Sequence, residues 1–510
     1  MKNSNRNVVF KAYDPSQPML LPPSLDELIP EGHPVRIVNQ IIEKIDLETL
    51  TKKYKGGGTS SYHPKMLLKI LVYGYLSNIY SSRRLAAAAK ESVCMMWLSG
   101  MSYPDHNTLN RFRGDRLKDV LKEVFTQVVL LLVESNHVDL KDAYTDGTKI
   151  EANANRYTFV WGKAIQNSKE RIAKQLEELW AYTLQVAKTE LGETAPDLTE
   201  IDAKKVTETI EKINTALKDK VVNEKVAKKL KYAQKEWPAK MEQYAEQEEI
   251  LKGRGSYSKT DPDATFMRMK DDHMQNGQLK AAYNVQISTQ KQFILSYSVH
   301  QKPGDPTTLI PHLEDFKKQY KQLPKSITAD AAYGSQENYT YLKNNEVEAF
   351  VKYNLFQQEQ QPDKIDEPGK VDNLYYNKER DCFYCPMGQP MQRIGSHKKK
   401  TDNGFEQEYV SYQAKNCANC PLRGICFKEP GNRIINVNYE LQRLKANARE
   451  LLLSKEGIKH RRQRSVDVEP VFGNIKQNKN FKRFMLWGIE KVEIETGLIA
   501  LAHNLAKLAA

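Results

Sequence analysis

The chain has 510 residues, of which 40% are hydrophobic and 9% aromatic, so it can build several packed cores and is not a wholly disordered protein. Its 77 basic residues outnumber its 64 acidic ones, and the net charge of +13 favours a polyanionic partner. No apolar run approaches the length of a membrane-spanning helix and the polar start shows no signal peptide, so we expect a cytoplasmic protein without membrane contact.

Residues 1–135 are predicted to form an all-α N-terminal domain. Residues 66–76 are apolar nearly all round, as in the central helix of a bundle. A turn at Gly100 separates two further helices, and Asp105 can cap the second one. This outline of a helix-turn-helix predicts DNA binding through polar side chains of the second helix, which are Asn107, Asn110, Arg111 and Arg113. Helix pairs of this kind also occur without DNA contact.

A strand is predicted over residues 138–146, and it ends at Asp146. A charged segment over residues 160–255 follows, in which apolar residues repeat at the spacing of packed helices. Pro238 is expected to interrupt a third helix there. We therefore predict a helical insert that projects from a domain. A spacer, a dimer contact and a DNA clamp are all compatible with it.

Strands return after the insert. Residues 279–299 predict a hairpin, and Asp305 with Pro306 begins a helix. A strand that ends at Asp330, a helix, and a strand over residues 347–353 follow. This order is typical of a ribonuclease H-like mixed sheet, so the predicted fold class is α+β. The catalytic domain would comprise residues 136–354 and 432–510.

Residues 355–431 form a Cys-rich insert between the two parts of that domain. Clustered cysteines in a cytoplasmic chain favour a metal over disulfides, and CxxC pairs supply thiolates to tetrahedral zinc. We therefore predict structural zinc, bound by four of five cysteines. Two sets are possible: both CxxC pairs, or the last four residues of the series Cys382, Cys385, Cys417, Cys420 and Cys426.

Three short segments each carry one carboxylate where catalysis would need it. Asp146 and Asp330 are expected at the ends of two strands of one sheet, and Glu469 is expected on a helix whose start is close to Pro470. Such carboxylates can converge on two Mg²⁺ or Mn²⁺ ions, which cut and join phosphodiesters. The sequence therefore predicts Asp146, Asp330 and Glu469 as catalytic metal ligands, although each alone would be an ordinary surface or capping residue.

Basic residues surround the third carboxylate. Residues 443–483 hold 12 Lys and Arg against four Asp and Glu. Lys476 follows Glu469 by two helical turns, so both side chains are expected on one helix face. We predict that DNA phosphates are contacted by Lys476, Arg464 and Lys149. A solvated basic helix is the simpler alternative for any single charge in this window.

The segments around the three carboxylates resemble those of bacterial insertion-sequence transposases of the DDE class. The matching stretches are residues 144–155, 328–334, 464–476 and 501–507, together with the Cys-rich insert. The likeness covers nearly the whole chain and is to the branch with such inserts in its catalytic domain. Related enzymes often place an Arg four residues before the Glu, whereas here Ser465 is at that position and Arg464 lies one residue earlier.

This resemblance implies metal binding by Asp146, Asp330 and Glu469 and cut-and-paste movement of a DNA element. The implied partner is double-stranded DNA, both as the terminal repeats of the element and as its target, which would place the protein at the nucleoid. Joining two DNA ends makes a homodimer the natural expectation. Two alternatives stay open: a metal-dependent nuclease of the same fold without strand transfer, and a DNA-binding regulator without catalysis.

Overall fold

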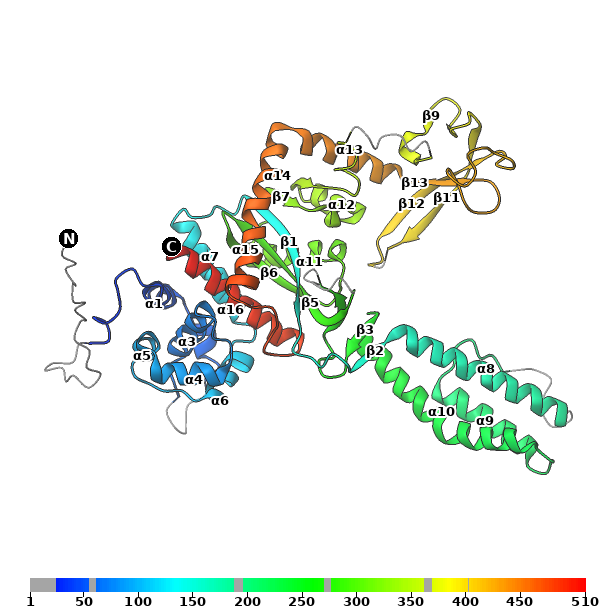
Figure 1. Cartoon of the computed structure of the whole chain (residues 1–510), viewed down its shortest axis with the longest axis horizontal. Coiled ribbons are helices and arrows are strands. Elements are labelled where there is room, and N and C mark those ends of the chain that lie inside the picture. Colours follow the sequence, from blue (N-terminus) through cyan, green and yellow to red (C-terminus); the bar gives the residue numbers. More distant parts are fainter. Residues whose placement is uncertain (1–23, 55–60, 188–195, 270–276, 362–368, 402) are drawn as a thin grey trace, which may run out of the picture.

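The structure is a computed structural model that describes residues 24–54, 61–187, 196–269, 277–361, 369–401 and 403–510. Figure 1 shows four parts: a group of N-terminal helices, a central sheet, a helical bundle that projects from it, and a smaller sheet. The mixture of helices and strands agrees with the predicted α+β class. None of the described helices has the length and apolar composition needed to cross a bilayer.

The N-terminal helices pack around one buried helix. They are α1 (Pro34–Lys44), α2 (Glu48–Thr51), α3 (Pro64–Leu76), α4 (Ser82–Glu91), α5 (Val93–Ser99), α6 (His106–Arg111) and α7 (Leu121–Glu134). α3 is buried along nearly its whole length, as its apolar sequence predicts. Gly100 ends α5 with a φ of 54°, and Asp105 caps α6 by accepting a hydrogen bond from the Thr108 amide at 2.6 Å. The predicted helix pair with its glycine turn is confirmed.

The central sheet has six strands in a mixed arrangement. They are β1 (Asp142–Glu151), β4 (Thr265–Arg268), β5 (Leu279–Gln290), β6 (Phe293–His300), β7 (Ser326–Ala329) and β8 (Glu348–Val351). β1 pairs with β5 in antiparallel and with β7 in parallel, and β8 continues in parallel beyond β7. β5 and β6 form the predicted hairpin, whose turn residues Lys291 and Gln292 both have positive φ. This sheet is compatible with a ribonuclease H-like domain.

β1 differs from the prediction in its bounds. It runs from Asp142 to Glu151, so the expectation that this strand ends at Asp146 is wrong. Its pairing with β7 covers only residues 142–144, whereas its pairing with β5 continues to Glu151. Asp146 therefore lies in the middle of a long strand, beyond the point where the neighbouring β7 has stopped pairing.

The helix α16 joins the N-terminal helices to the sheet. The helices around the sheet are α11 (Leu309–Tyr320), α12 (Gln336–Asn344), α13 (Tyr439–Leu453), α14 (Lys455–Asp467), α15 (Glu469–Gly473) and α16 (Ile489–Leu508). α16 packs against α3, α7 and β6, and its residues 494–505 are all buried. One apolar core therefore extends from α1 and α3 through α16 to β5 and β6. A second core lies between β7, β8, α12 and α13.

Three helices between β1 and β5 form the projecting bundle (Figure 1). They are α8 (Gly162–Val186), α9 (Ala203–Leu217) and α10 (Glu224–Leu251), and the short strands β2 (Phe159–Trp161) and β3 (Ser256–Ser258) pair at their base. The bundle has its own apolar core. Pro238 does not interrupt α10, so that prediction is wrong. Trp237 and Met241 are both buried in the bundle core, and this packing offsets the hydrogen bond that a proline removes.

The Cys-rich insert contains a five-stranded antiparallel sheet in the order β13-β12-β11-β10-β9. The strands are β9 (Tyr375–Asn377), β10 (Cys382–Tyr384), β11 (Pro390–Lys400), β12 (Glu406–Ala414) and β13 (Ile434–Val437). A small core that includes Phe383, Met391 and Tyr412 holds this sheet together. It lies on the opposite side of the central sheet from the N-terminal helices (Figure 1).

Candidate active site

The two candidate aspartates lie where β1 and β7 separate. Asp330 directly follows the last residue of β7, and its Oδ1 accepts a hydrogen bond from the Ala331 amide at 2.8 Å. Asp146 lies two residues beyond the last β1 residue that pairs with β7, and its Oδ1 accepts from the Gly147 amide at 2.8 Å. Because the two strands are parallel neighbours, both carboxylates lie at the same edge of the sheet.

Glu469 begins α15, and Pro470 stands at the first turn of that helix, which confirms the predicted helix start. Asp467 fixes the junction between α14 and α15 to the central sheet. Its buried carboxylate accepts hydrogen bonds from the Thr289 hydroxyl at 2.8 Å and from the Gln292 amide at 3.0 Å, both on the β5–β6 hairpin. These contacts hold the start of α15, and with it Glu469, against the sheet.

One arginine side chain faces all three carboxylates. The Arg464 Nη2 atom lies 3.1 Å from Asp146 Oδ2 and 3.8 Å from Asp330 Oδ2, and its Nη1 atom lies 3.6 Å from Glu469 Oε1. Because both aspartate oxygens contact the same nitrogen, they lie no farther apart than the sum of those two distances. That is within reach of a pair of ions about 4 Å apart. The structure thus brings the three predicted carboxylates together.

The four side chains differ in their exposure to solvent. Arg464 is 10% exposed and Asp146 is 14% exposed, whereas Asp330 is 50% and Glu469 is 60% exposed. The cluster therefore has a buried half and an open half. Among the described residues, the side of Asp330 and Glu469 is the one from which a phosphate or a cation can approach.

A hydrogen-bonded chain supports the backbone on both sides of the cluster. The Tyr333 hydroxyl, on the loop after β7, donates to Gln286 Oε1, and Gln286 Nε2 donates to Asp305 Oδ1 at 3.2 Å. Gln286 lies opposite Gly147, where a Cβ atom would come within 2.2 Å of its Nε2 atom. Burial, with two nearby aspartates, holds the pKa of Tyr333 well above its usual range, so its hydroxyl remains a donor.

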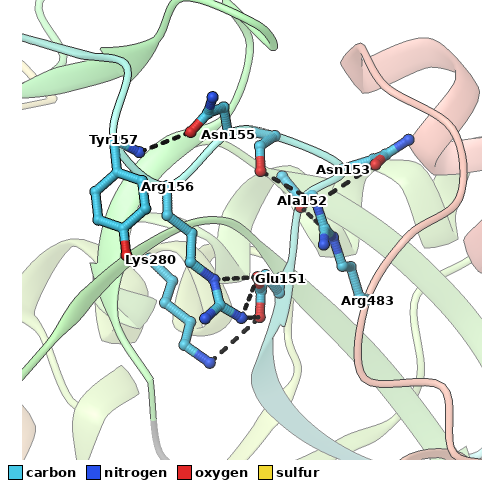
Figure 2. A network of polar contacts seen from close by, with 9 residues as sticks. Glu151, Ala152, Asn153, Asn155, Arg156, Tyr157, Lys280 and Arg483 are labelled. Carbon is cyan, nitrogen blue, oxygen red and sulfur yellow. Dashed lines mark hydrogen bonds and ion pairs between the residues drawn. The ribbon is translucent and has the colours of Figure 1, made fainter.

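The far end of β1 is fixed by a polar network (Figure 2). Glu151 forms ion pairs with Arg156 at 3.2 Å and with Lys280 at 3.3 Å. Arg483 donates to the carbonyl oxygens of Ala152 and Ala154, at 3.2 and 3.1 Å. The loop after β1 is therefore tied both to the sheet and to the segment before α16.

The predicted DNA-contacting residues lie in very different places. Arg111 is exposed on α6, and Lys149 donates to the Arg268 carbonyl at 3.1 Å. Lys476 is 7% exposed and lies in a π-helical turn, Asn474–Asn478, so the expected two regular turns between Glu469 and Lys476 are interrupted.

Arg113 is not on the surface, contrary to the prediction that it contacts DNA. It is 2% exposed, lies 3.9 Å from Glu495 Oε1, and donates to the Tyr75 hydroxyl at 3.1 Å. Arg113 lies in the π-helical turn Phe112–Arg116, which follows α6, four residues after the buried Leu109. Residues four apart share one helix face, so the side chain lies on the face that packs inward.

No disulfide is formed by the cysteines of the described residues. Cys382 is buried within β10, whereas Cys385 and Cys417 lie beside the core of the small sheet. Their sulfur atoms accept hydrogen bonds from the Gln389 and Arg433 amides, at 3.3 and 3.4 Å. Within the described part of the chain, no group of three or more His, Cys, Asp or Glu side chains is arranged to hold a metal ion.

The donor chemistry of the carboxylate cluster nevertheless fits divalent cations. Three carboxylates already converge on one positively charged group, and Mg²⁺ and Mn²⁺ prefer such oxygen ligands. No local pattern places Asp305, Gln286 or Tyr333 beside them, because Asp305 is predicted only as a helix cap. The glycine immediately after Asp146 was the available signal, since it marks a close approach of another side chain to β1.

Two family models match the chain. One, described as a transposase DDE domain, matches residues 384–509, and the other, described as a transposase domain (DUF772), matches residues 23–115. The first match contains Arg464 and Glu469, and the second covers α1 to α6. No curated protein and no solved structure matches the chain.

Proposed function

Because these two matches identify the chain as a transposase of the insertion-sequence DDE family, we propose that it binds the ends of a DNA element and catalyses their cleavage and strand transfer. The observation that carries the proposal is the contact of Asp146, Asp330 and Glu469 with one guanidinium group. Carboxylates from two strands and one helix meet there, at a sheet edge that is open on one side.

Asp146 and Asp330 would hold the divalent cations, and Glu469 would complete the ligand shell or orient the attacking water. Two Mg²⁺ or Mn²⁺ ions supply an activated nucleophile and stabilise the leaving oxygen. The chain's own part is to fix the carboxylates. Asp467 holds the start of α15, and the chain from Tyr333 to Asp305 holds the loop after β7.

Double-stranded DNA would approach over the basic surface around the cluster. Supporting this are the surplus of Lys and Arg in residues 443–483 and the exposed Arg111 on α6. The helices α5 and α6 would contact the terminal repeats, and Lys149 and Lys476 would lie closer to the cut. A homodimer would hold two ends together. Arg113 has no part in DNA contact, because its guanidinium is buried and donates to the Tyr75 hydroxyl and the Tyr80 carbonyl.

The Cys-rich insert is proposed to bind structural zinc. Cys385 and Cys417 lie beside one small core that does not include Cys382, which favours the set completed by Cys420 and Cys426. Arg433 donates to the Cys426 sulfur at 2.8 Å, so a positive charge already lies at this thiol. The zinc content of the purified chain, with and without Cys426→Ser, tests the assignment.

A strand-transfer assay with matched element ends tests the catalytic proposal. Asp146→Asn should abolish cleavage and joining, a loss of roughly 10³-fold or more, because a metal ligand is removed. DNA binding by the same variant should remain. Asp219→Asn, on the exposed turn after α9, is the matched control and should keep full activity.

The same assay separates the alternatives. Cleavage without joining would favour a nuclease of this fold. Cleavage that survives in Asp146→Asn would contradict the site assignment, and specific DNA binding without any cleavage by the unaltered chain would favour a regulator.

A further inference from the structure

We propose that Arg464 is a displaceable cation that occupies the metal-binding space of the cluster until divalent ions replace it. The inference rests on the proposed function, since it assumes that Asp146, Asp330 and Glu469 are the metal ligands. It assigns to Arg464 a role other than the predicted phosphate contact: control of when the cluster binds metal.

The Arg464 guanidinium overlaps with the position that a shared metal ion would take. The Nη2 atom lies 3.1 Å from one aspartate oxygen and 3.8 Å from the other, so it stands between Asp146 and Asp330. An ion shared by these two carboxylates would need the same space, because Mg²⁺ lies about 2.1 Å from its oxygen ligands. A guanidinium nitrogen and a divalent ion cannot both occupy it, and their like charges would also repel each other.

The contacts of Arg464 with the three carboxylates are weak. Charge-assisted hydrogen bonds between nitrogen and oxygen are typically about 2.7–2.9 Å long. The three contacts of Arg464 are longer, at 3.1, 3.8 and 3.6 Å, and its Nε atom is buried without an acceptor among the described residues. Among the described residues, the side chain thus balances charge through ion pairs longer than typical charge-assisted hydrogen bonds.

A hydrated ion has access to the open half of the cluster. Asp330 and Glu469 are half-exposed or more, so a hydrated ion can reach their oxygens while Arg464 is still in place. Binding there would weaken the contacts of Arg464 one after another. The guanidinium would leave last from Asp146, which is its closest partner. Until then, the guanidinium stays between the carboxylates.

The consequence is a lower affinity for metal in the DNA-free protein. When the binding-competent state is only a fraction of the population, the apparent affinity falls by that fraction. Replacing Arg464 by a neutral residue should therefore strengthen metal binding. If Arg464 instead helped to shape the metal site, the same replacement would weaken binding.

Titration of the DNA-free full-length chain with Mn²⁺, followed by the electron paramagnetic resonance signal of the free ion, distinguishes these outcomes. Arg464→Gln should bind Mn²⁺ about 10-fold more tightly than the unaltered chain. Arg462→Gln removes an equal charge from an exposed position on the same helix and should change the affinity less than about 2-fold. Unchanged or weaker binding by Arg464→Gln would overturn the proposal.

Asp146→Asn separates this inference from the proposed function. If Mn²⁺ binding does not depend on Asp146 in any background, the metal site itself is misassigned and the proposed function fails. If binding depends on Asp146 but Arg464→Gln does not strengthen it, only the displacement by metal is wrong.

A measurement on the unaltered chain covers the case in which Arg464→Gln does not fold. Phenylglyoxal modifies accessible guanidinium groups, and mass spectrometry locates the modified residues. Addition of Mn²⁺ should increase the modification of Arg464 and leave that of Arg462 unchanged. Constant or decreased modification of Arg464 would mean that the guanidinium stays in place, which contradicts the proposal.

Discussion

Arg113 and Arg464 are both almost fully buried, and both face acidic side chains, but their surroundings differ. Arg113 donates to the Tyr80 carbonyl at 2.7 Å and to the Tyr75 hydroxyl at 3.1 Å, and its partner Glu495 has no exposed surface. Arg464 contacts three carboxylates at 3.1, 3.8 and 3.6 Å, and two of these carboxylates are half-exposed or more. The first arginine belongs to a closed network and the second to an open one.

The difference separates a structural pair from an exchangeable one. Glu495 also accepts hydrogen bonds from the Met485 and Leu486 amides, both at 2.8 Å, so it ties the segment before α16 to the N-terminal helices. Burial raises the pKa of Glu495, and the Arg113 charge opposes that shift. A carboxylate in such a place needs its arginine at all times. The carboxylates around Arg464 can exchange theirs for another cation or for water.

Replacement of each arginine by methionine should give the largest contrast. Arg113→Met leaves Glu495 buried without its counter-charge, and we expect the free energy of unfolding to fall by about 3–5 kcal/mol. Arg464→Met leaves Asp330 and Glu469 in contact with solvent and only Asp146 largely buried, so the loss should be smaller, about 1 kcal/mol. Denaturant unfolding of both variants measures the difference. Equal losses would show that the two networks are not distinct in kind.

Gly147→Ala should have the next largest effect on stability, because Gln286 packs closely against Gly147 beside the carboxylate cluster. The added methyl group would lie 2.2 Å from the Gln286 side chain, and overpacking of this kind costs about 1–3 kcal/mol. The displaced Gln286 would also lose its contact with Tyr333, so Mn²⁺ affinity should fall. Gly473→Ala, on α15, meets no atom within 4 Å and should leave stability unchanged or slightly higher. Similar results for both alanines would contradict this account of Gly147.

Acid should lower the stability of the folded chain through the buried His312. Its two ring nitrogens form hydrogen bonds with the Ser288 and Ser298 hydroxyls, both at 2.8 Å. Burial lowers the pKa of His312 from 6.5 to about 3. Because the folded pKa lies below the unfolded one, stability that is present above pH 6.5 is lost as the pH falls towards 3. This group contributes a slope of about 1.4 kcal/mol per pH unit.

The unfolding free energy, measured from pH 7 to pH 4.5, should depend less on pH in His312→Asn than in the unaltered chain. His397→Asn, on the exposed β11, serves as the control and should keep the full dependence. An unchanged slope in His312→Asn would mean that His312 is not the group that takes up the proton.

Local sequence patterns predicted much of the fold. The apolar run of α3, the Asp105 cap and the β5–β6 hairpin are each set by neighbours in the chain, and all three are present. The positions of Asp330 after a strand and of Glu469 at a helix start were also foreseeable, because both are local features, whereas Asp146 does not end its strand. Whether these residues bind metal stays a prediction.

The remaining features depend on contacts between distant segments. Nothing near Arg113 in the sequence reveals its distant partner Glu495. Pro238 is tolerated because the bundle core holds the helix on both sides of it. Asp146 lies within a strand because β5 continues to pair with β1 after β7 has ended. Each of these is decided by packing partners that no local pattern shows.

The position of α16 has a consequence for synthesis of the chain. α3 is enclosed partly by α16, which is translated roughly 350 residues after α7. At a synthesis rate of about 5–20 residues per second, roughly 20 to 70 s pass between the synthesis of α7 and that of α16. A product truncated before α16 would leave α3 partly exposed, so the N-terminal helices would lack a stable cover until synthesis of the chain is nearly finished.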